Sequence, residues 1–436
     1  MAGMMGSRDL RIEVDWVDGD GVVTPELAAT WCRLSLFVGD RCVTLVDDTK
    51  SGVRHAVYTA AYPLAEWIAY NWWSLRHEIR ASAIPSHSWA WSTVHGNPWL
   101  RRHNFRGAGG GMPWPDFTVV PEGGVSRVTW RSGPGLSHQP IRFIGSGDHY
   151  LQSDQLADEL ARFVTQVGDR LDGIGIASPL SKEWRALSEL DEDEAAFAQA
   201  SARLGLDPFS MAEDAERELV SIASSLEQPL LDEFLDSADP QRMRIAFGWL
   251  AKARDRAHDA SPSSNAVLDL RSPLGATGSS VRPFERGYEL ARGIRHKLGL
   301  APTAKMAIGD FVSKVSVVQP AAGLEGLSSR RPSGQVVLVL PGQRLPPSAV
   351  RFAQARALGL ALVTDRAECL LDPASTDLMK ETRAFAAELL APADGIRQAL
   401  DTLPAATEQM FDAVAAQFNT SSWLVQLQYE NQVLSH

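Results

Sequence analysis

The stretch that decides the fold of the last third of the chain is residues 351–360, RFAQARALGL. Upstream, residues 283–298 have the apolar spacing of an amphipathic helix that ends at Gly299. Between the two, residues 336–340, VVLVL, have the composition of a β-strand. Downstream, residues 381–392, ETRAFAAELLAP, again have helical spacing. This order of elements predicts an α+β domain over residues 283–436.

In sequence and in order, these segments resemble the ImmA/IrrE family of zinc metallopeptidases. The active-site helix of that family is approximately R-F-T-x-A-H-E-L-G-H, and its second helix is roughly E-A-N-x-F-A-A-x-L-L-M-P. The framework positions that agree with the active-site helix are Arg351, Phe352, Ala355, Leu358 and Gly359. The resemblance covers about 150 residues, one third of the chain. It implies a zincin-like α+β fold for this domain.

The positions that carry the chemistry of the family differ in this chain. Arg356 and Leu360 replace the two histidines, and Ala357 replaces the glutamate. Histidines one helical turn apart bind zinc on one face, and the glutamate activates the zinc-bound water. An arginine instead brings a permanent positive charge, and a leucine offers no lone pair. Glu381 stands where the family has its third ligand, so the resemblance implies a pseudo-peptidase with no catalytic residue, metal or cofactor.

Two interpretations of Arg356 remain open on the sequence. We expect it to pair with Glu381, because a salt bridge would replace the metal link between the two helices and an unpaired buried carboxylate would be costly. The alternative is a solvent-facing residue with no role. A metallopeptidase with a non-standard site is a further alternative, although His296 and His436 are the only histidines after the predicted linker.

Composition and charge favour a cytoplasmic protein of two or three domains. The 436 residues are 44% hydrophobic and 22% charged, which is ordinary for a globular protein. No run approaches the roughly 18 to 20 apolar residues of a membrane span, and no signal peptide is recognisable. The net charge of −11 argues against a general nucleic-acid-binding surface. Three cysteines, Cys32, Cys42 and Cys369, are too few for a disulfide framework.

Residues 1–150 predict an aromatic-rich α+β domain, since 10 of the 13 tryptophans lie before residue 131. One helix is expected over residues 62–79, and the Gly-Gly step at 123–124 predicts a hairpin turn. The strands are expected at residues 10–17, 41–46, 117–120 and 126–130.

Arginine and aromatic residues alternate near the middle of this domain and form a candidate binding patch. Such a pattern binds phosphates, bases or a peptide in some proteins, and in others it is aromatic core beside a surface loop. The candidate residues are Trp99, Arg101, Arg102, His103, Arg106 and Trp114, preceded by His87, Trp89, Trp91 and His95. The following glycines, residues 107–111, match neither a P-loop nor a dinucleotide-binding pattern.

Helical spacing begins at Ser153 and continues to residue 258. This segment is acidic: residues 151–265 hold 11 basic against 23 acidic residues. Asp191 and Glu194 have the spacing of a capping box, and Ser181 is expected to start a helix. Residues 259–282, rich in serine, proline and glycine, predict a linker.

Three functions are consistent with the sequence. The first is a non-catalytic regulator or scaffold that binds a protein partner, since the ImmA/IrrE resemblance implies phage-defence, toxin–antitoxin or mobile-element systems. The second is an enzyme acting through the N-terminal domain. The third is a module that binds nucleic acid or another ligand through the arginine and tryptophan patch. No membrane association is expected.

Overall fold

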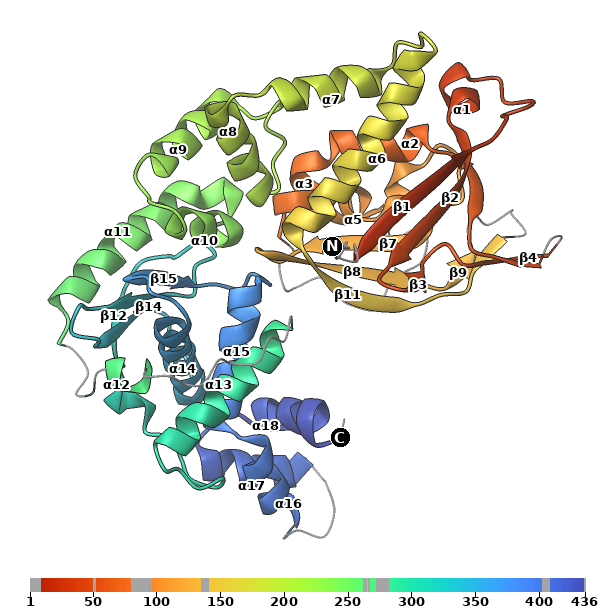
Figure 1. Cartoon of the computed structure of the whole chain (residues 1–436). Coiled ribbons are helices and arrows are strands. Elements are labelled where there is room, and N and C mark those ends of the chain that lie inside the picture. The colour runs from red at the N-terminus through yellow and green to blue at the C-terminus, as the bar shows by residue number, and fades with distance from the viewer. Residues whose placement is uncertain are drawn as a thin grey trace, which may run out of the picture. The chain divides into compact units, whose positions relative to one another are not determined.

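The computed structural model describes residues 9–49, 52–79, 94, 96–134, 141–261, 265, 267–271, 282–401 and 408–434. The chain is a mixed α+β protein with several small sheets and a helical middle region (Figure 1). It divides into two compact units, Met1–Met211 and Ala212–His436, called here the N-terminal and C-terminal units. Over the described residues, no helix has the length and apolar character needed to cross a membrane.

The N-terminal unit contains three small antiparallel sheets. In the first, β2 is central and pairs with β1 along its whole length, from Leu10 opposite Val38 to Trp16 opposite Cys32. The second has the order β5-β4-β10-β9 and the third β11-β8-β7. The strands are β1 (Leu10–Trp16), β2 (Trp31–Val38), β3 (Arg41–Cys42), β4 (Val46–Asp48), β5 (Gly52–Arg54), β6 (Val57–Ala60), β7 (Asp116–Pro121), β8 (Val125–Arg131), β9 (Gly133–Pro134), β10 (Ile141–Phe143) and β11 (Gly147–Gln152).

The β7–β8 hairpin confirms the turn predicted at Gly123, whose φ of 94° suits glycine. The single helix predicted over residues 62–79 is wrong, because it is interrupted at Asn71. There the backbone of Asn71 leaves helical geometry, with φ −108° and ψ 17°, and its side chain donates to the carbonyl of Trp67 at 2.7 Å. The helices of the unit are α1 (Pro25–Ala29), α2 (Tyr62–Tyr70), α3 (Trp72–His77), α5 (Pro98–His103), η1 (Phe105–Ala108), α6 (Ser153–Gly173), α7 (Pro179–Glu189) and α8 (Glu192–Arg203).

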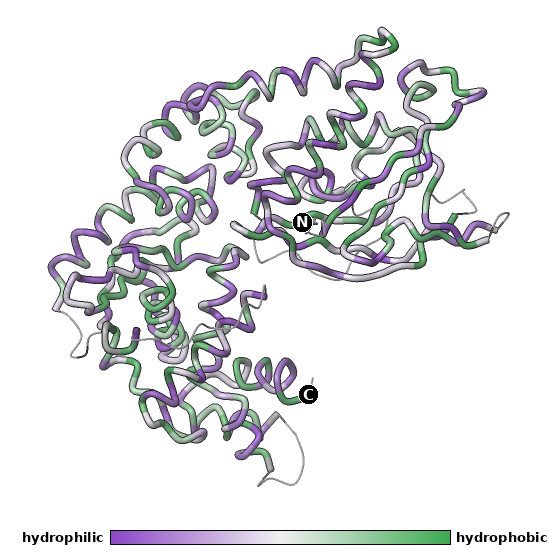
Figure 2. The backbone as a smooth tube through the Cα atoms, viewed as in Figure 1, coloured by the Kyte–Doolittle hydropathy of each residue, from purple (hydrophilic) through white to green (hydrophobic). Residues whose placement is uncertain are grey.

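Helix α6 covers the core of the N-terminal unit with one apolar face. Leu160, Phe163, Val164 and Val167 are fully buried, and Figure 2 shows hydrophobic and hydrophilic residues alternating around its turns. The predicted capping box of α8 is confirmed. Helix α7 begins at Pro179 rather than at Ser181, since Ser178 accepts the cap hydrogen bond from the Ser181 amide.

The C-terminal unit is built around a four-stranded sheet of order β12-β14-β13-β15. Strand β14 is buried along its length and pairs in parallel with β12 and antiparallel with β13. The strands are β12 (Val312–Val317), β13 (Gly326–Arg330), β14 (Val336–Pro341) and β15 (Glu368–Leu371). The helices are α9 (Glu213–Ala223), α10 (Leu230–Ser237), η2 (Pro240–Arg242), α11 (Met243–Asp259), α12 (Leu268–Arg271), α13 (Pro283–Lys297), η3 (Ile308–Asp310), α14 (Pro347–Val363), α15 (Asp377–Leu390), α16 (Ala393–Asp401), α17 (Glu408–Phe418), α18 (Ser422–Gln428) and the π-helix η4 (Tyr429–Val433).

The division into units differs from the predicted domain boundaries. Helices α6 to α8 belong to the N-terminal unit and α9 to α11 to the C-terminal unit, so the middle segment 151–258 is shared between them. The described part of the predicted linker packs on the C-terminal unit. Val267 and Leu270 are buried in its core, and the Val267 amide donates to Gly334.

One edge of the C-terminal sheet is covered by α10. The amide of Leu370 in β15 donates to the Glu233 carboxylate at 2.7 Å. Arg366 lies 2.7 Å from the other oxygen of the same carboxylate. Burial raises the pKa of Glu233 to about 7. The outward amide of Leu370 therefore has a side-chain partner.

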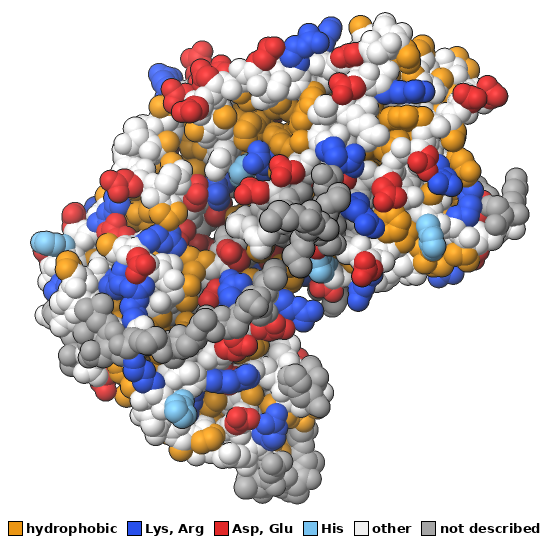
Figure 3. All heavy atoms as spheres, viewed as in Figure 1, with side chains coloured by type: hydrophobic (Ala, Val, Ile, Leu, Met, Phe, Trp, Pro, Cys, Tyr) orange, Lys and Arg blue, Asp and Glu red, His pale blue; other side chains and the backbone are white. Residues whose placement is uncertain are grey.

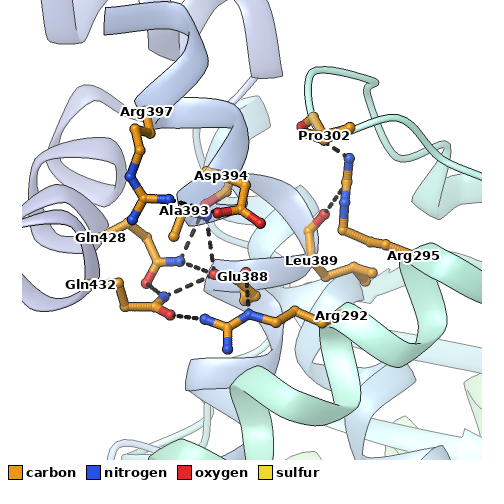
Figure 4. A network of polar contacts seen from close by, with 11 residues as sticks. Arg292, Arg295, Pro302, Glu388, Leu389, Ala393, Asp394, Arg397, Gln428 and Gln432 are labelled. Atoms are coloured by element: carbon orange, nitrogen blue, oxygen red, sulfur yellow. Dashed lines mark hydrogen bonds and ion pairs between the residues drawn. The ribbon is translucent and has the colours of Figure 1, made fainter. Parts of the chain in front are cut away.

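The C-terminal helices are held to α13 and α15 by a polar network around Glu388 (Figure 4). The Glu388 carboxylate is buried and accepts from Arg292 at 3.1 Å, Gln428 at 2.9 Å and Gln432 at 2.8 Å. Nearby, Arg295 donates to the carbonyls of Leu389 and of the loop after α13. The Ala393 amide of α16 also donates to the Glu388 carboxylate, at 3.2 Å. Five elements thus meet at one charge, which fixes how the final helices pack.

Helices α13, α14 and α15 approach one another closely at two glycines. A Cβ on Gly287 of α13 would lie 2.2 Å from the Glu381 carbonyl oxygen of α15, and one on Gly359 of α14 would lie 2.8 Å from Phe385. These contacts set the spacing of the three helices. They also place residues 356, 357, 360 and 381 at the centre of the unit.

We expect Gly287→Ala to destabilise the protein by about 2 kcal/mol or more, because the methyl group meets backbone that cannot move aside. Gly248→Ala in α11 is the matched control. Its Cβ would make only an ordinary contact, at 3.7 Å from Gln319, so it should be neutral or stabilise by about 0.5 kcal/mol. Urea unfolding measures both, and equal effects of the two substitutions would contradict the close packing.

Candidate functional site

Arg356 lies inside the C-terminal unit and is 4% exposed. One guanidinium nitrogen pairs with Glu325, which precedes β13. The other donates to the Asp372 carbonyl at 2.9 Å and contacts the Met379 sulfur at 3.3 Å. The solvent-facing alternative for Arg356 is therefore wrong, and so is the expected pairing with Glu381.

Glu381 points from α15 toward α13. Arg286 donates to one oxygen of its carboxylate through both Nε, at 3.0 Å, and Nη2, at 2.7 Å. Burial raises the pKa of Glu381, and the Arg286 charge opposes that shift. The close contact at Gly287 brings α13 to this face of α15, which is why Arg286 and not Arg356 neutralises the carboxylate.

The other two α14 positions compared above with the family motif are apolar and packed. Ala357 and Leu360 are 0% and 1% exposed and belong to the main core of the unit. With Arg356 they occupy the buried part of α14. Helix α14 therefore uses the residues at these positions for packing and for one ion pair.

The residues present do not fit a zinc ion. A ligand set needs several neutral or anionic donors around one point, but here a guanidinium stands at the first position and a leucine at the second. The carboxylate of Glu381 is already paired with Arg286. His296 is exposed on α13, and His436 lies outside the described residues. Within the described ranges, no three His, Cys, Asp or Glu side chains gather as a metal site.

A second carboxyl group, that of Asp372, lies beside Arg356 and is 1% exposed. Its Oδ1 accepts from the Ala374 amide at 2.8 Å, while Oδ2 has no hydrogen-bond partner among the described residues. Burial raises the pKa of Asp372 to about 7, against the lowering influence of Arg356 and Arg383. Arg383 donates to the carbonyls of Asp372 and Ala374, and burial lowers its pKa to about 10.

The Asp372 carboxyl makes the stability of the unit depend on pH. Its folded pKa of about 7 exceeds the unfolded value of roughly 3.9. The proton therefore stabilises the fold fully below pH ~4, and this contribution is lost as the pH rises through ~7.

We expect Asp372→Asn to raise the free energy of unfolding by about 2 kcal/mol more at pH 8 than at pH 5, relative to the unmodified chain. Asp255→Asn, on the exposed side of α11, should show no such difference in urea unfolding. A pH-independent effect of Asp372→Asn would contradict the assignment.

In the N-terminal unit, the structure places most of the predicted binding patch in the interior. Trp99 stacks on His103 with ring centroids 4.0 Å apart. His103 is fully buried, and its ring nitrogens lie 3.0 Å from the Val119 carbonyl and 3.2 Å from Glu78. Burial lowers the pKa of His103. His87, Trp89, Trp91 and His95 lie outside the described residues.

The other members of the patch divide between interior and surface. Arg106 is buried against Asp116 at 3.5 Å, and the indole of buried Trp114 donates to Gly109. Arg102 pairs with Glu78 and is partly exposed. Arg101 is exposed, and its side chain forms no hydrogen bond or ion pair among the described residues. The two surface arginines are the part of the patch that lines a cavity.

That cavity has a volume of about 710 Å³ and lies within the N-terminal unit. Helices α2, α3 and α5 line it on one side, and α7 with the loop after α8 on the other. Most of its lining residues lie outside the predicted binding patch. They come from the predicted helix over residues 62–79, from α7 and from the loop after α8. The aromatic and charged lining residues are Trp67, Tyr70, Trp73, Phe209, Arg101, Arg102, Glu183 and Asp207.

Comparison with known proteins adds no identification. No protein-family model matches the chain, and no curated protein matches it.

Proposed function

We propose that the chain is a regulatory or scaffold protein whose C-terminal unit has a zincin-like, ImmA/IrrE-type framework and binds a protein partner without cleaving it. The resemblance of residues 351–360 and 381–392 to the two metal-binding helices of that family supports this proposal. Such a resemblance favours a role in a bacterial phage-defence, toxin–antitoxin or mobile-element system.

The observation that carries the proposal is the pairing of the buried Arg356 guanidinium with Glu325, whose side chain is 44% exposed. This guanidinium joins α14 to Glu325 before β13 and to the Asp372 carbonyl after β15. In the proposed framework, these protein contacts replace the link that the metal makes in a family peptidase. A domain that folds without the metal keeps its surface available for binding a partner. Helix α14 offers neither zinc ligands nor a general base, so cleavage of that partner is not expected.

The first experiment separates a binding protein from a peptidase. Purified full-length chain is expected to contain less than about 0.1 zinc per molecule after dialysis against zinc, and to leave unfolded casein intact with or without a chelator. Co-expression with the products of the adjacent genes should then yield a complex that co-elutes in size-exclusion chromatography. Chelator-sensitive cleavage, or failure of every neighbouring gene product to associate, would count against the proposal.

A second experiment tests the family framework itself. The triple variant Arg356→His, Leu360→His and Arg286→Gln places two imidazoles one turn apart on α14 and releases Glu381 from its partner. We expect it to bind about one zinc per chain in equilibrium dialysis and to gain thermal stability when zinc is added. The single variant Arg356→His is the control and should bind none. A triple variant with unchanged circular dichroism and no zinc would show that α14 and α15 do not share the family arrangement.

A further inference from the structure

The cavity of the N-terminal unit has the size and walls of a binding groove. Its volume of about 710 Å³ falls within the range of roughly 300 to 1,000 Å³ that is usual for ligand sites. Two large side chains at its rim remain open to solvent, Tyr70 at 57% and Phe209 at 71% exposure. Figure 3 shows hydrophobic side chains exposed together in a hollow below α7, beside α3. Aromatic groups left uncovered in a concave surface are typical of recognition sites.

The floor of this groove is fixed by close backbone contacts. The Trp67 indole donates to the Arg101 carbonyl at 2.8 Å. A Cβ on Gly107 would lie 2.2 Å from that same carbonyl oxygen and 2.9 Å from the indole nitrogen. Opposite, Gly205 has a φ of 68° and would bring a Cβ within 3.2 Å of Glu78. The groove is therefore formed before a ligand arrives, which lowers the entropic cost of binding.

The charges around the groove favour a cationic ligand. Arg102 is neutralised by Glu78, which leaves Arg101 as the one arginine of the lining without a partner among the described residues. Glu183 lies on the other side and forms no ion pair or hydrogen bond in the described part of the chain. Burial and the nearby Asp207 charge raise the pKa of Glu183, and Glu183 contributes in turn to the raised pKa of Tyr70. Asp207 also lines the groove, and its carboxylate accepts from the Phe209 amide and the Ser210 hydroxyl. Glu183 is therefore the carboxylate available to a ligand beside the exposed Tyr70 ring, and with Asp207 it outweighs the charge of Arg101.

We propose that this groove binds a peptide segment carrying a lysine or arginine side chain. The cationic group pairs with Glu183 and lies against the Tyr70 ring, where a cation–π contact adds to the charge pairing. Apolar neighbours in the same segment cover Phe209 and the Trp73 side of the groove. A phosphate-bearing ligand fits less well, since it would meet one unpaired arginine and two carboxylates. This site is separate from the C-terminal unit and does not depend on the function proposed for it.

The probe is an immobilised array of random-sequence peptides, incubated with the purified full-length chain. Bound peptides should be enriched in lysine and arginine relative to the array. The best binder, labelled with fluorescein, should lose about tenfold in affinity with Glu183→Gln and a similar amount with Tyr70→Ala, measured by anisotropy. Glu189→Gln, on the exposed end of the same helix α7, is the matched control and should leave the affinity unchanged. Both groove residues are partly exposed, so these variants keep the fold.

Three outcomes would overturn the proposal. The array could show no binding, or enrichment in acidic rather than basic residues. Glu183→Gln and Glu189→Gln could have equal effects on the best binder. A fluorescein-labelled oligothymidine that binds the chain and is released by Arg101→Ala, but not by Glu183→Gln, would assign the groove to an anionic ligand instead.

Discussion

A guanidinium buried in an apolar core needs partner groups that compensate its charge, and Arg356 imposes this constraint on the C-terminal unit. Glu325 supplies the counter-charge and the Asp372 carbonyl a further acceptor, while the Nε of Arg356 has no hydrogen-bond partner among the described residues. The segments before β13 and after β15 are thereby tied to α14. Removing either the charge or its partner would leave an unpaired group at the point where helix and sheet meet.

The helices around this charge pack through contacts that tolerate little change. Gly287 and Gly359 let α13 and α14 approach α15, and the same approach delivers Arg286 to Glu381. Further along α15, Glu388 collects amide and guanidinium groups from α13, α18 and η4. Each buried carboxylate of α15 is thus compensated from a neighbouring helix. The unit is organised by paired charges within an apolar frame.

The sequence predicted elements better than it predicted partners. The apolar stripe of α6, the capping box of α8 and the β7–β8 hairpin follow from local patterns, which neighbouring residues determine. The central strand β2 was missed, although its residues from Cys32 to Val38 alternate between buried and more exposed. The break at Asn71 is a change of backbone angles at one residue, and the partners of Arg356 lie on segments about 16 and 31 residues away. These two features are determined by three-dimensional packing and not by the local sequence. Similarly, the arginine and tryptophan pattern did not show that the side chains of His103 and Trp114 are buried. It also did not show that those of Tyr70 and Phe209 are exposed to solvent.

The contact between Glu233 and β15 has a consequence for how the C-terminal unit meets other proteins. A strand that joined the sheet beside Leu370 would need that residue's amide as its first donor, but the amide is already bonded to a carboxylate of α10. Extension of the sheet at this border would require α10 to leave and Arg366 to lose its counter-ion. The β15 edge of the sheet is therefore guarded against the addition of another strand.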